Sequence, residues 1–131
     1  MKKVIVLGHG GYAEGVRQNL DMVAGLSDHM YFIDLKKDDD LSTLENKVKQ
    51  LIESFAEDDE VLFACDLVGA SPFRVAAMTC VDHPGKYITV AGLNQMAFME
   101  LNLSADSDLT IDGLADLAIE TTKAAIARFP E

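Results

Sequence analysis

The sequence predicts an α/β protein with an open, parallel four-stranded sheet and helices on both faces. Short apolar runs alternate along the chain with segments whose apolar residues recur at helical spacing. These runs are continuously apolar, as expected for strands that are covered on both faces. Strand–helix repeats joined by right-handed crossovers give a parallel sheet.

One domain spanning residues 1–131 is expected, because no linker, repeat or low-complexity segment interrupts the pattern. The formal net charge of −11 argues against nucleic acid or an anionic membrane as a partner, since both require a basic surface. The apolar runs are much shorter than the roughly 20 residues that span a bilayer, so a cytoplasmic protein is expected. Cys65 and Cys80 lie in apolar surroundings and are expected to be free, buried thiols.

The first strand is predicted at 3–7, and it leads directly into a glycine-lined turn that contains His9. Gly8, Gly10 and Gly11 free the backbone to adopt positive φ and are expected to leave the histidine accessible. Open α/β sheets bind their ligands at the carboxyl ends of the strands, which is where His9 is predicted to lie.

The later elements follow in regular alternation. They are predicted as a helix at 12–25, a strand at 29–35, a helix that begins at Ser42 and ends before 58, a strand at 60–66, a helix from 71 to 81, a strand at 86–91, and helices at 94–103 and 112–126. Ser42 followed by Glu45 is a capping-box pattern, which predicts the start of the second helix. Ser71 followed by Pro72 predicts the start of the third, with the serine as N-cap and the proline in the first helical position.

Chemically competent residues follow the first and third strands. Asp66 ends the third strand, and Gly69 leads from it to Ser71 at a helix start. A carboxylate that accepts a proton from one ring nitrogen of His9 fixes the tautomer and leaves the other nitrogen as a nucleophile. A helix N-terminus with a hydroxyl is suited to holding a phosphate. The sequence therefore predicts a histidine that accepts a phosphoryl group, with His9 and Asp66 as catalytic residues and Ser71, Gly69 and Gly10 as phosphate-binding residues.

Two other interpretations stand beside this one. A histidine in a glycine turn is more often structural than catalytic, and an aspartate or serine at such places commonly caps a turn or a helix. Residues 8–13 also fit the G-x-G-x-x-A dinucleotide fingerprint, and Asp34 ends the second strand where a ribose-binding acid would stand. That fingerprint needs no histidine, and it leaves the loop after the third strand without a role.

His29 and His83 are expected to be surface residues, and three scattered histidines predict no metal site.

Three segments carry a resemblance to a known family: VIVLGHGGYAEG at 4–15, DLVGASPFRVA at 66–76 and AGLNQMAFME at 91–100. The chain resembles the enzyme IIA domain of the mannose/sorbose class of the bacterial phosphoenolpyruvate-dependent sugar phosphotransferase system. The resemblance implies that His9 takes a phosphoryl group from the carrier HPr and passes it to a histidine of enzyme IIB. It implies that Asp66 orients the His9 ring, that Ser71 hydrogen-bonds the phosphoryl oxygens, and that no metal or organic cofactor takes part. An indirect link to the membrane components IIC and IID is implied as well.

The resemblance also implies a homodimer in which a C-terminal antiparallel strand crosses to the partner's sheet, and here only 125–129 can supply that strand. The chain departs from the family pattern at three places. A second glycine is common where Ala70 stands, asparagine is common where Arg74 stands, and an aliphatic residue, proline and methionine usually occupy 95–97. None of these departures removes a catalytic group. A regulatory module, or a phosphoryl donor like that of dihydroxyacetone kinase, is the alternative within the same chemistry.

Overall fold

The computed structural model describes residues 1–131 and confirms the α/β fold. The elements are β1 (Lys2–His9), α1 (Tyr12–Val23), β2 (Met30–Leu35), α2 (Leu41–Glu53), β3 (Glu60–Cys65), α3 (Ser71–Val81), β4 (Tyr87–Ala91), α4 (Gln95–Ser104) and α5 (Ile111–Ala124). All four strands are parallel and lie in the order β2-β1-β3-β4. Because β1 and β3 are central neighbours, the loops that follow them lie side by side at the carboxyl edge of the sheet.

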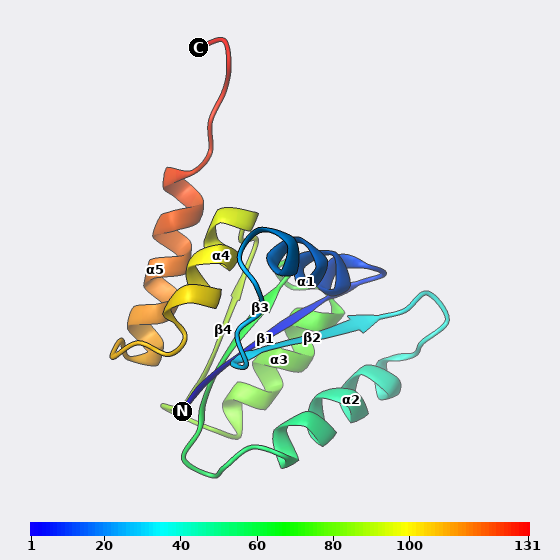
Figure 1. The fold of residues 1–131 in the computed structure, drawn as a ribbon. Helices are drawn as coiled ribbons and strands as arrows, with labels where there is room; N and C mark the ends of the chain where they lie inside the picture. The colour runs from blue at the N-terminus through cyan, green and yellow to red at the C-terminus, as the bar shows by residue number, and fades with distance from the viewer.

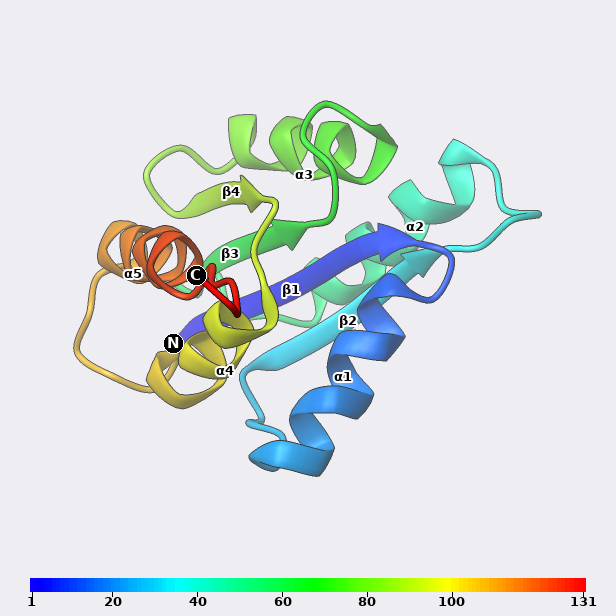
Figure 2. The same cartoon turned by 90° about the horizontal axis from the view of Figure 1, so that it is seen from above.

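Helices cover both faces of the sheet, with α1, α4 and α5 on one face and α2 and α3 on the other (Figures 1 and 2). Val4 and Val6 of β1 pack with the first group of helices. Ile5 and Leu7, which point the opposite way, pack with the second group. All four side chains are fully buried, which explains why this strand is continuously apolar.

The capping-box prediction for α2 is wrong. The helix begins at Leu41, and the Asp40 carboxylate accepts a hydrogen bond from the Thr43 N–H at 2.9 Å. An aspartate is as good an N-cap as a serine, and its charge also interacts favourably with the helix dipole, so the earlier residue takes the role. Ser42 therefore lies inside the first turn.

The α3 start is shifted by one residue from the prediction. Ala70 is the N-cap residue and makes no side-chain cap, Ser71 is the first helical residue, and Pro72 occupies the second position. The Ser71 hydroxyl makes no hydrogen bond within the chain, so the prediction that Ser71 is the N-cap of this helix is wrong. The hydroxyl is free for another partner.

A residue from a neighbouring strand caps α1. Asp34, at the end of β2, accepts hydrogen bonds from the backbone N–H groups of Ala13 at 2.8 Å and Glu14 at 3.0 Å. Its side chain is buried, so these two donors would have no other partner if the carboxylate were removed.

Asp34→Ala is therefore expected to lower the free energy of unfolding by about 1–2 kcal/mol, measured by chemical denaturation. Asp40→Ala removes an exposed cap of the same kind at α2, and it is expected to cost less because water can replace the lost acceptor. An Asp34→Ala variant as stable as the wild type would contradict this capping role.

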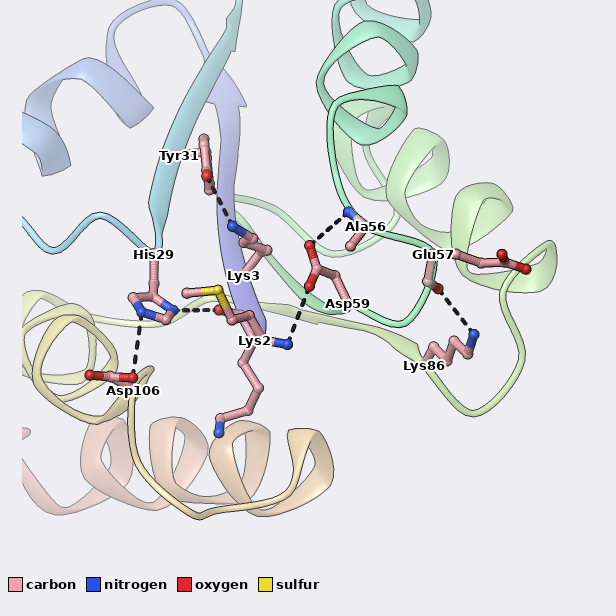
Figure 3. A network of polar contacts seen from close by, with 10 residues as sticks. Lys2, Lys3, His29, Tyr31, Ala56, Glu57, Asp59, Lys86 and Asp106 are labelled. Carbon is pink, nitrogen blue, oxygen red and sulfur yellow. Dashed lines mark hydrogen bonds and ion pairs between the residues drawn. The ribbon is translucent and has the colours of Figure 1, made fainter.

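The amino edge of the sheet, opposite to His9, holds a polar network (Figure 3). The prediction that His29 is a surface residue is wrong, because its ring is buried beside the first residues of β1. Nδ1 of His29 donates to the Lys2 carbonyl at 2.7 Å, and Nε2 lies 3.7 Å from the Asp106 carboxylate. Asp59 is buried in the same region and pairs with the N-terminal amine at 3.2 Å. These groups join the start of β1 to the neighbouring loops.

The chain leaves α5 after Ala124, two residues before the predicted end, and residues 125–131 project away from the body of the molecule (Figure 1). Ile126 and Phe129 in this tail are 75% and 97% exposed.

Cys65 is buried, Cys80 is half-buried, and both are free thiols, as expected. None of the helices has the length and apolar composition needed to cross a membrane.

Candidate active site

The carboxyl edge of the sheet brings His9 and Asp66 into direct contact. Nδ1 of His9 lies 2.7 Å from Oδ2 of Asp66, and the same oxygen accepts the His9 backbone N–H at 2.9 Å. The other carboxylate oxygen accepts the Leu67 N–H at 2.8 Å. The Asp66 N–H donates to the carbonyl of Leu7 at 3.1 Å, so the β1–β3 pairing itself sets the position of the carboxylate.

Charge is retained on Asp66 although its side chain is only 10% exposed. Burial alone would raise the pKa of this carboxyl, but hydrogen bonds from the His9 ring, the His9 N–H and the Leu67 N–H outweigh it and hold the pKa below its usual range. An ionised carboxylate accepts the Nδ1–H of the imidazole and so selects the tautomer in which Nε2 carries the lone pair. Nε2 has no hydrogen-bond partner in the chain, and the His9 side chain is 43% exposed. The arrangement presents a nucleophilic nitrogen to solvent.

The three glycines around His9 have different roles. A Cβ on Gly8 would overlap the ring of Tyr12, so this glycine makes room for the tyrosine ring and not for a partner at His9. Gly10 has a φ of 62°, a conformation that favours glycine, and the space beside Gly10 and Gly11 is open. The expectation that all three keep the histidine accessible therefore needs correction at Gly8.

The N-terminus of α3 is open, unlike that of α1. The backbone N–H groups of Gly69, Ser71 and Phe73 donate to no acceptor in the chain, and the Ser71 hydroxyl is also free. Gly69 has a φ of 79°, which again favours glycine. The Arg74 side chain returns to this loop and donates through Nε to the Gly69 carbonyl at 3.0 Å. An anion at this end of α3 would meet unpaired donors next to a guanidinium.

The Gly10 N–H has a different partner. It donates to the Leu35 carbonyl at 2.9 Å, so it is already used within the chain. The predicted phosphate-binding residues thus differ in what they offer: Ser71 and Gly69 have free donors, whereas Gly10 shapes the turn after His9.

The dinucleotide interpretation does not fit the structure. The pyrophosphate of a dinucleotide binds at the N-terminus of the first helix, and here Asp34 occupies that position with a buried carboxylate bonded to two N–H groups. A second negative group at the same place would be repelled.

The structure offers no metal site, and it places the other two histidines away from His9. No group of three His, Cys, Asp or Glu side chains is arranged to hold a metal ion. His83 lies in the turn before β4, at the amino edge, where it stacks on Tyr87 with ring centroids 4.0 Å apart. His29 and His83 are therefore not brought to His9.

Sequence reasoning missed two apolar side chains beside the site. Leu67 and Val68 follow Asp66 directly and are 60% and 78% exposed. The sequence did contain a signal for this exposure. Leu67 and Val68 are adjacent apolar residues in a loop before a glycine, where no strand or helix pattern directs them into the core. A groove of about 800 Å³ between α2 and α3 also begins at this edge, with Ser71 and Arg74 among its lining residues.

Comparisons with known proteins agree with the resemblance carried by the motifs. The sequence model of the family described as the PTS system fructose IIA component matches residues 3–119. The chain is 32% identical over 122 residues to the PTS mannose-specific EIIAB component of Escherichia coli strain K12, which covers 92% of this chain and 38% of that protein. It is 27% identical over 101 residues to the PTS fructose-specific EIIA component of Bacillus subtilis strain 168, which covers 77% of this chain and 68% of that protein.

Solved structures give the same result. The phosphotransferase system component EIIA from Streptococcus agalactiae superposes with a TM-score of 0.88 at 27% identity, covering 98% of each chain. The mannose/sorbose-specific IIA subunit from Enterococcus faecalis gives a TM-score of 0.84 at 28% identity, covering 100% of this chain and 97% of the other. The chain therefore belongs to the family described as the PTS system fructose IIA component, and it spans about two fifths of the length of the mannose-specific EIIAB protein that it matches.

Proposed function

We propose that this chain takes a phosphoryl group from the phosphohistidine of HPr onto Nε2 of His9 and passes it to a histidine of enzyme IIB. The observation that carries the proposal is the 2.7 Å contact between Nδ1 of His9 and Asp66, which leaves the exposed Nε2 as the nucleophile. In the first step an N–P bond forms at Nε2 while the N–P bond of HPr breaks. The second step is the same exchange with the histidine of enzyme IIB.

Asp66 has two roles in this relay. It holds the ring in the tautomer that exposes the Nε2 lone pair, and its charge stabilises the positive charge that the ring gains as Nε2 attacks phosphorus. The Nδ1 proton stays on the ring throughout, so neither transfer requires a proton to be removed or returned. Because no proton is moved, the transfer can run in either direction, which suits a relay between two histidines.

The N-terminus of α3 is proposed to hold the phosphoryl oxygens. The free N–H groups of Gly69 and Ser71 and the Ser71 hydroxyl supply hydrogen bonds, and Arg74 adds positive charge beside the loop. Gly10 contributes by giving the turn after His9 its shape, since its own N–H donates to Leu35.

Ser71→Ala is expected to lower the rate of phosphoryl uptake by about 10- to 100-fold, because it removes a donor to a charged group in the transition state. Stability is expected to stay unchanged, because the hydroxyl makes no cap on α3. Ser42→Ala, at an exposed serine in the first turn of α2, is the matched control and should retain the wild-type rate. Rapid-quench measurements of label uptake at saturating phospho-HPr give both rates; an unchanged rate in Ser71→Ala would remove the serine from the proposed phosphate site.

The surface around His9 supports docking of protein carriers. Leu67 and Val68 flank the site, and Met96 at the start of α4 is 52% exposed. Two partners must reach one imidazole in turn, and exposed apolar side chains beside it offer area to bury in each encounter. The net charge of −11 favours partners with basic surfaces.

A homodimer is proposed as well, formed when residues 125–129 of each chain add an antiparallel strand to the sheet of the other. β4 is an edge strand, with β3 as its only neighbour, and the tail that would pair with such an edge exposes Ile126 and Phe129. The mass in solution of the chain with and without residues 125–131 tests this pairing: both masses at the monomer value would contradict it.

Reconstitution with purified partners tests the relay. With phosphoenolpyruvate, enzyme I and HPr, the chain should acquire label, and the label should move to enzyme IIB when that component is added. Transfer to a dihydroxyacetone kinase subunit in place of enzyme IIB would favour the alternative donor role, and label that moves to neither would favour a regulatory one. Failure to acquire label from HPr would overturn the proposal. The relay would operate in the cytoplasm and connect to IIC and IID only through enzyme IIB.

A further inference from the structure

Two buried polar atoms lie behind the active site without a hydrogen-bond partner in the protein: the hydroxyl of Tyr12 and the amide nitrogen Nε2 of Gln95. Each belongs to the first residue of a helix at the carboxyl edge, Tyr12 in α1 and Gln95 in α4. Buried polar groups in native proteins nearly always have a partner, from the chain or from an ordered water. Two such atoms near the same edge call for an explanation.

Both residues lie over the same end of the sheet. The Tyr12 ring rests on the bare backbone of Gly8, which directly follows the paired residue Leu7 on β1. By alternation Gly8 is on the face covered by α1, α4 and α5. The ring meets Phe98 edge-on, with centroids 6.2 Å apart, and Phe98 is three residues after Gln95 on α4. Residues three apart lie on the same face of a helix, so Gln95 and Phe98 share one face of α4, and the Gln95 amide nitrogen on that face is buried.

This region adjoins Asp66. Asp66 follows Cys65 on β3 as Gly8 follows Leu7 on β1, and Leu7 and Cys65 are partners in the sheet. Burial raises the pKa of the Tyr12 hydroxyl to about 12, and the negative charge of the nearby Asp66 carboxylate adds to the rise. Tyr12 is therefore a neutral donor at every pH at which the protein functions.

Asp66 has room for one more donor. A carboxylate accepts about four hydrogen bonds. Oδ2 receives the His9 ring and the His9 N–H, whereas Oδ1 receives only the Leu67 N–H. The side chain is 10% exposed, so a further donor to Oδ1 has to come mostly from within the protein.

We propose that Tyr12 and Gln95 hold one ordered water behind Asp66 and act through that carboxylate as positioning residues for His9. The Tyr12 hydroxyl and the Gln95 amide donate to the water oxygen, and the water donates to Oδ1 of Asp66. Three hydrogen bonds are typical of a buried water. This deepens the proposed function, on which its consequence for phosphoryl transfer rests: the water keeps the carboxylate ionised and fixed in the orientation that engages Nδ1 of His9.

The titration of Asp66 in the unphosphorylated protein tests the proposal, followed by NMR at its carboxyl carbon. Tyr12→Phe and Gln95→Leu each remove one donor while retaining the size of the side chain. Fewer hydrogen bonds destabilise the ionised form, so the proton affinity of Asp66 is expected to rise by about threefold in each variant. Tyr31→Phe, which removes a hydroxyl at the amino edge, is the control and should leave Asp66 unchanged. The other titratable groups on neighbouring elements are His9 on β1, and Cys65, whose pKa burial raises to about 12, on β3.

A crystal structure at high resolution gives the second readout, with density for a water within hydrogen-bond distance of Tyr12, Gln95 and Asp66. The double variant Tyr12→Phe/Gln95→Leu should shift Asp66 no more than the larger single variant, because both side chains hold the same water. An Asp66 titration that is unchanged in Tyr12→Phe, or no water at this place in the wild type, would overturn the proposal. Neither measurement uses HPr, so this proposal and the relay can fail separately. If only the relay is wrong, the chain acquires no label from HPr, although the Asp66 titration still changes in Tyr12→Phe and Gln95→Leu.

Discussion

His9→Gln is expected to abolish phosphoryl uptake from phospho-HPr while leaving the fold intact. The substitution removes the Nε2 nucleophile, and the glutamine amide can still donate to Asp66 in place of Nδ1–H. Uptake should fall by at least about three orders of magnitude, to the background of the assay. Because the His9 side chain is partly exposed and lies at the end of β1, the thermal transition should be close to that of the wild type.

His83→Gln is the matched control for this result. His83 stacks on Tyr87 at the amino edge of the sheet, so its loss should leave phosphoryl uptake at the wild-type rate. Label uptake by His9→Gln at the wild-type level, in a folded protein, would show that the phosphoryl group is accepted elsewhere.

Asp66→Asn is expected to have the second largest effect, a fall of about 10²- to 10⁴-fold in the single-turnover rate. An asparagine directed to Nδ1 can present an N–H group, which selects the tautomer that protonates Nε2 and removes the nucleophilic lone pair. The neutral amide also cannot stabilise the positive charge that the ring gains. Asp40→Asn, at the cap of α2, is the control, because asparagine is an equally good N-cap. A rate for Asp66→Asn within a few-fold of the wild type would show that the carboxylate does not set the tautomer.

The contact between His9 and Asp66 also affects how the free energy of unfolding depends on pH. The pKa of Asp66 is lower in the folded protein than its usual value, so its ionised form stabilises the fold above the unfolded pKa of about 3.9. That contribution is lost as the pH falls through the folded pKa. The difference in unfolding free energy between wild type and Asp66→Asn should therefore be constant near neutral pH and narrow in the acid range below about pH 4. Denaturant unfolding at several pH values measures this difference.

The fold could be predicted because its determinants are local. The continuously apolar run of β1, buried on both faces, distinguishes a parallel sheet from an antiparallel one with a solvent-exposed face. Parallel strands bring the loops after β1 and β3 to one edge, which is enough to predict that His9 and Asp66 meet.

The errors arose where two side chains compete for one role, or where the partner of a residue is not given by a short-range pattern. Asp40 and Ser42 can both cap α2, and only the path of the chain decides that the aspartate does so. Asp34 caps α1 from the end of β2, a contact that no short-range pattern contains. Likewise Gly8 looked like part of a phosphate loop, whereas its lack of a side chain serves the Tyr12 ring. His29 was misplaced because its partner, the carbonyl of Lys2, belongs to a strand distant in sequence.

The atom that carries the phosphoryl group is the most direct test of the relay chemistry. After phosphorylation by phosphoenolpyruvate, enzyme I and HPr, NMR of the protein labelled with ¹⁵N at histidine distinguishes phosphorus bound at Nε2 from phosphorus bound at Nδ1. A single phosphohistidine at residue 9, modified at Nε2, is expected, because Nδ1 is held by Asp66 at 2.7 Å. Phosphorus on Nδ1 of His9, or on any other residue, would contradict the proposed roles of His9 and Asp66.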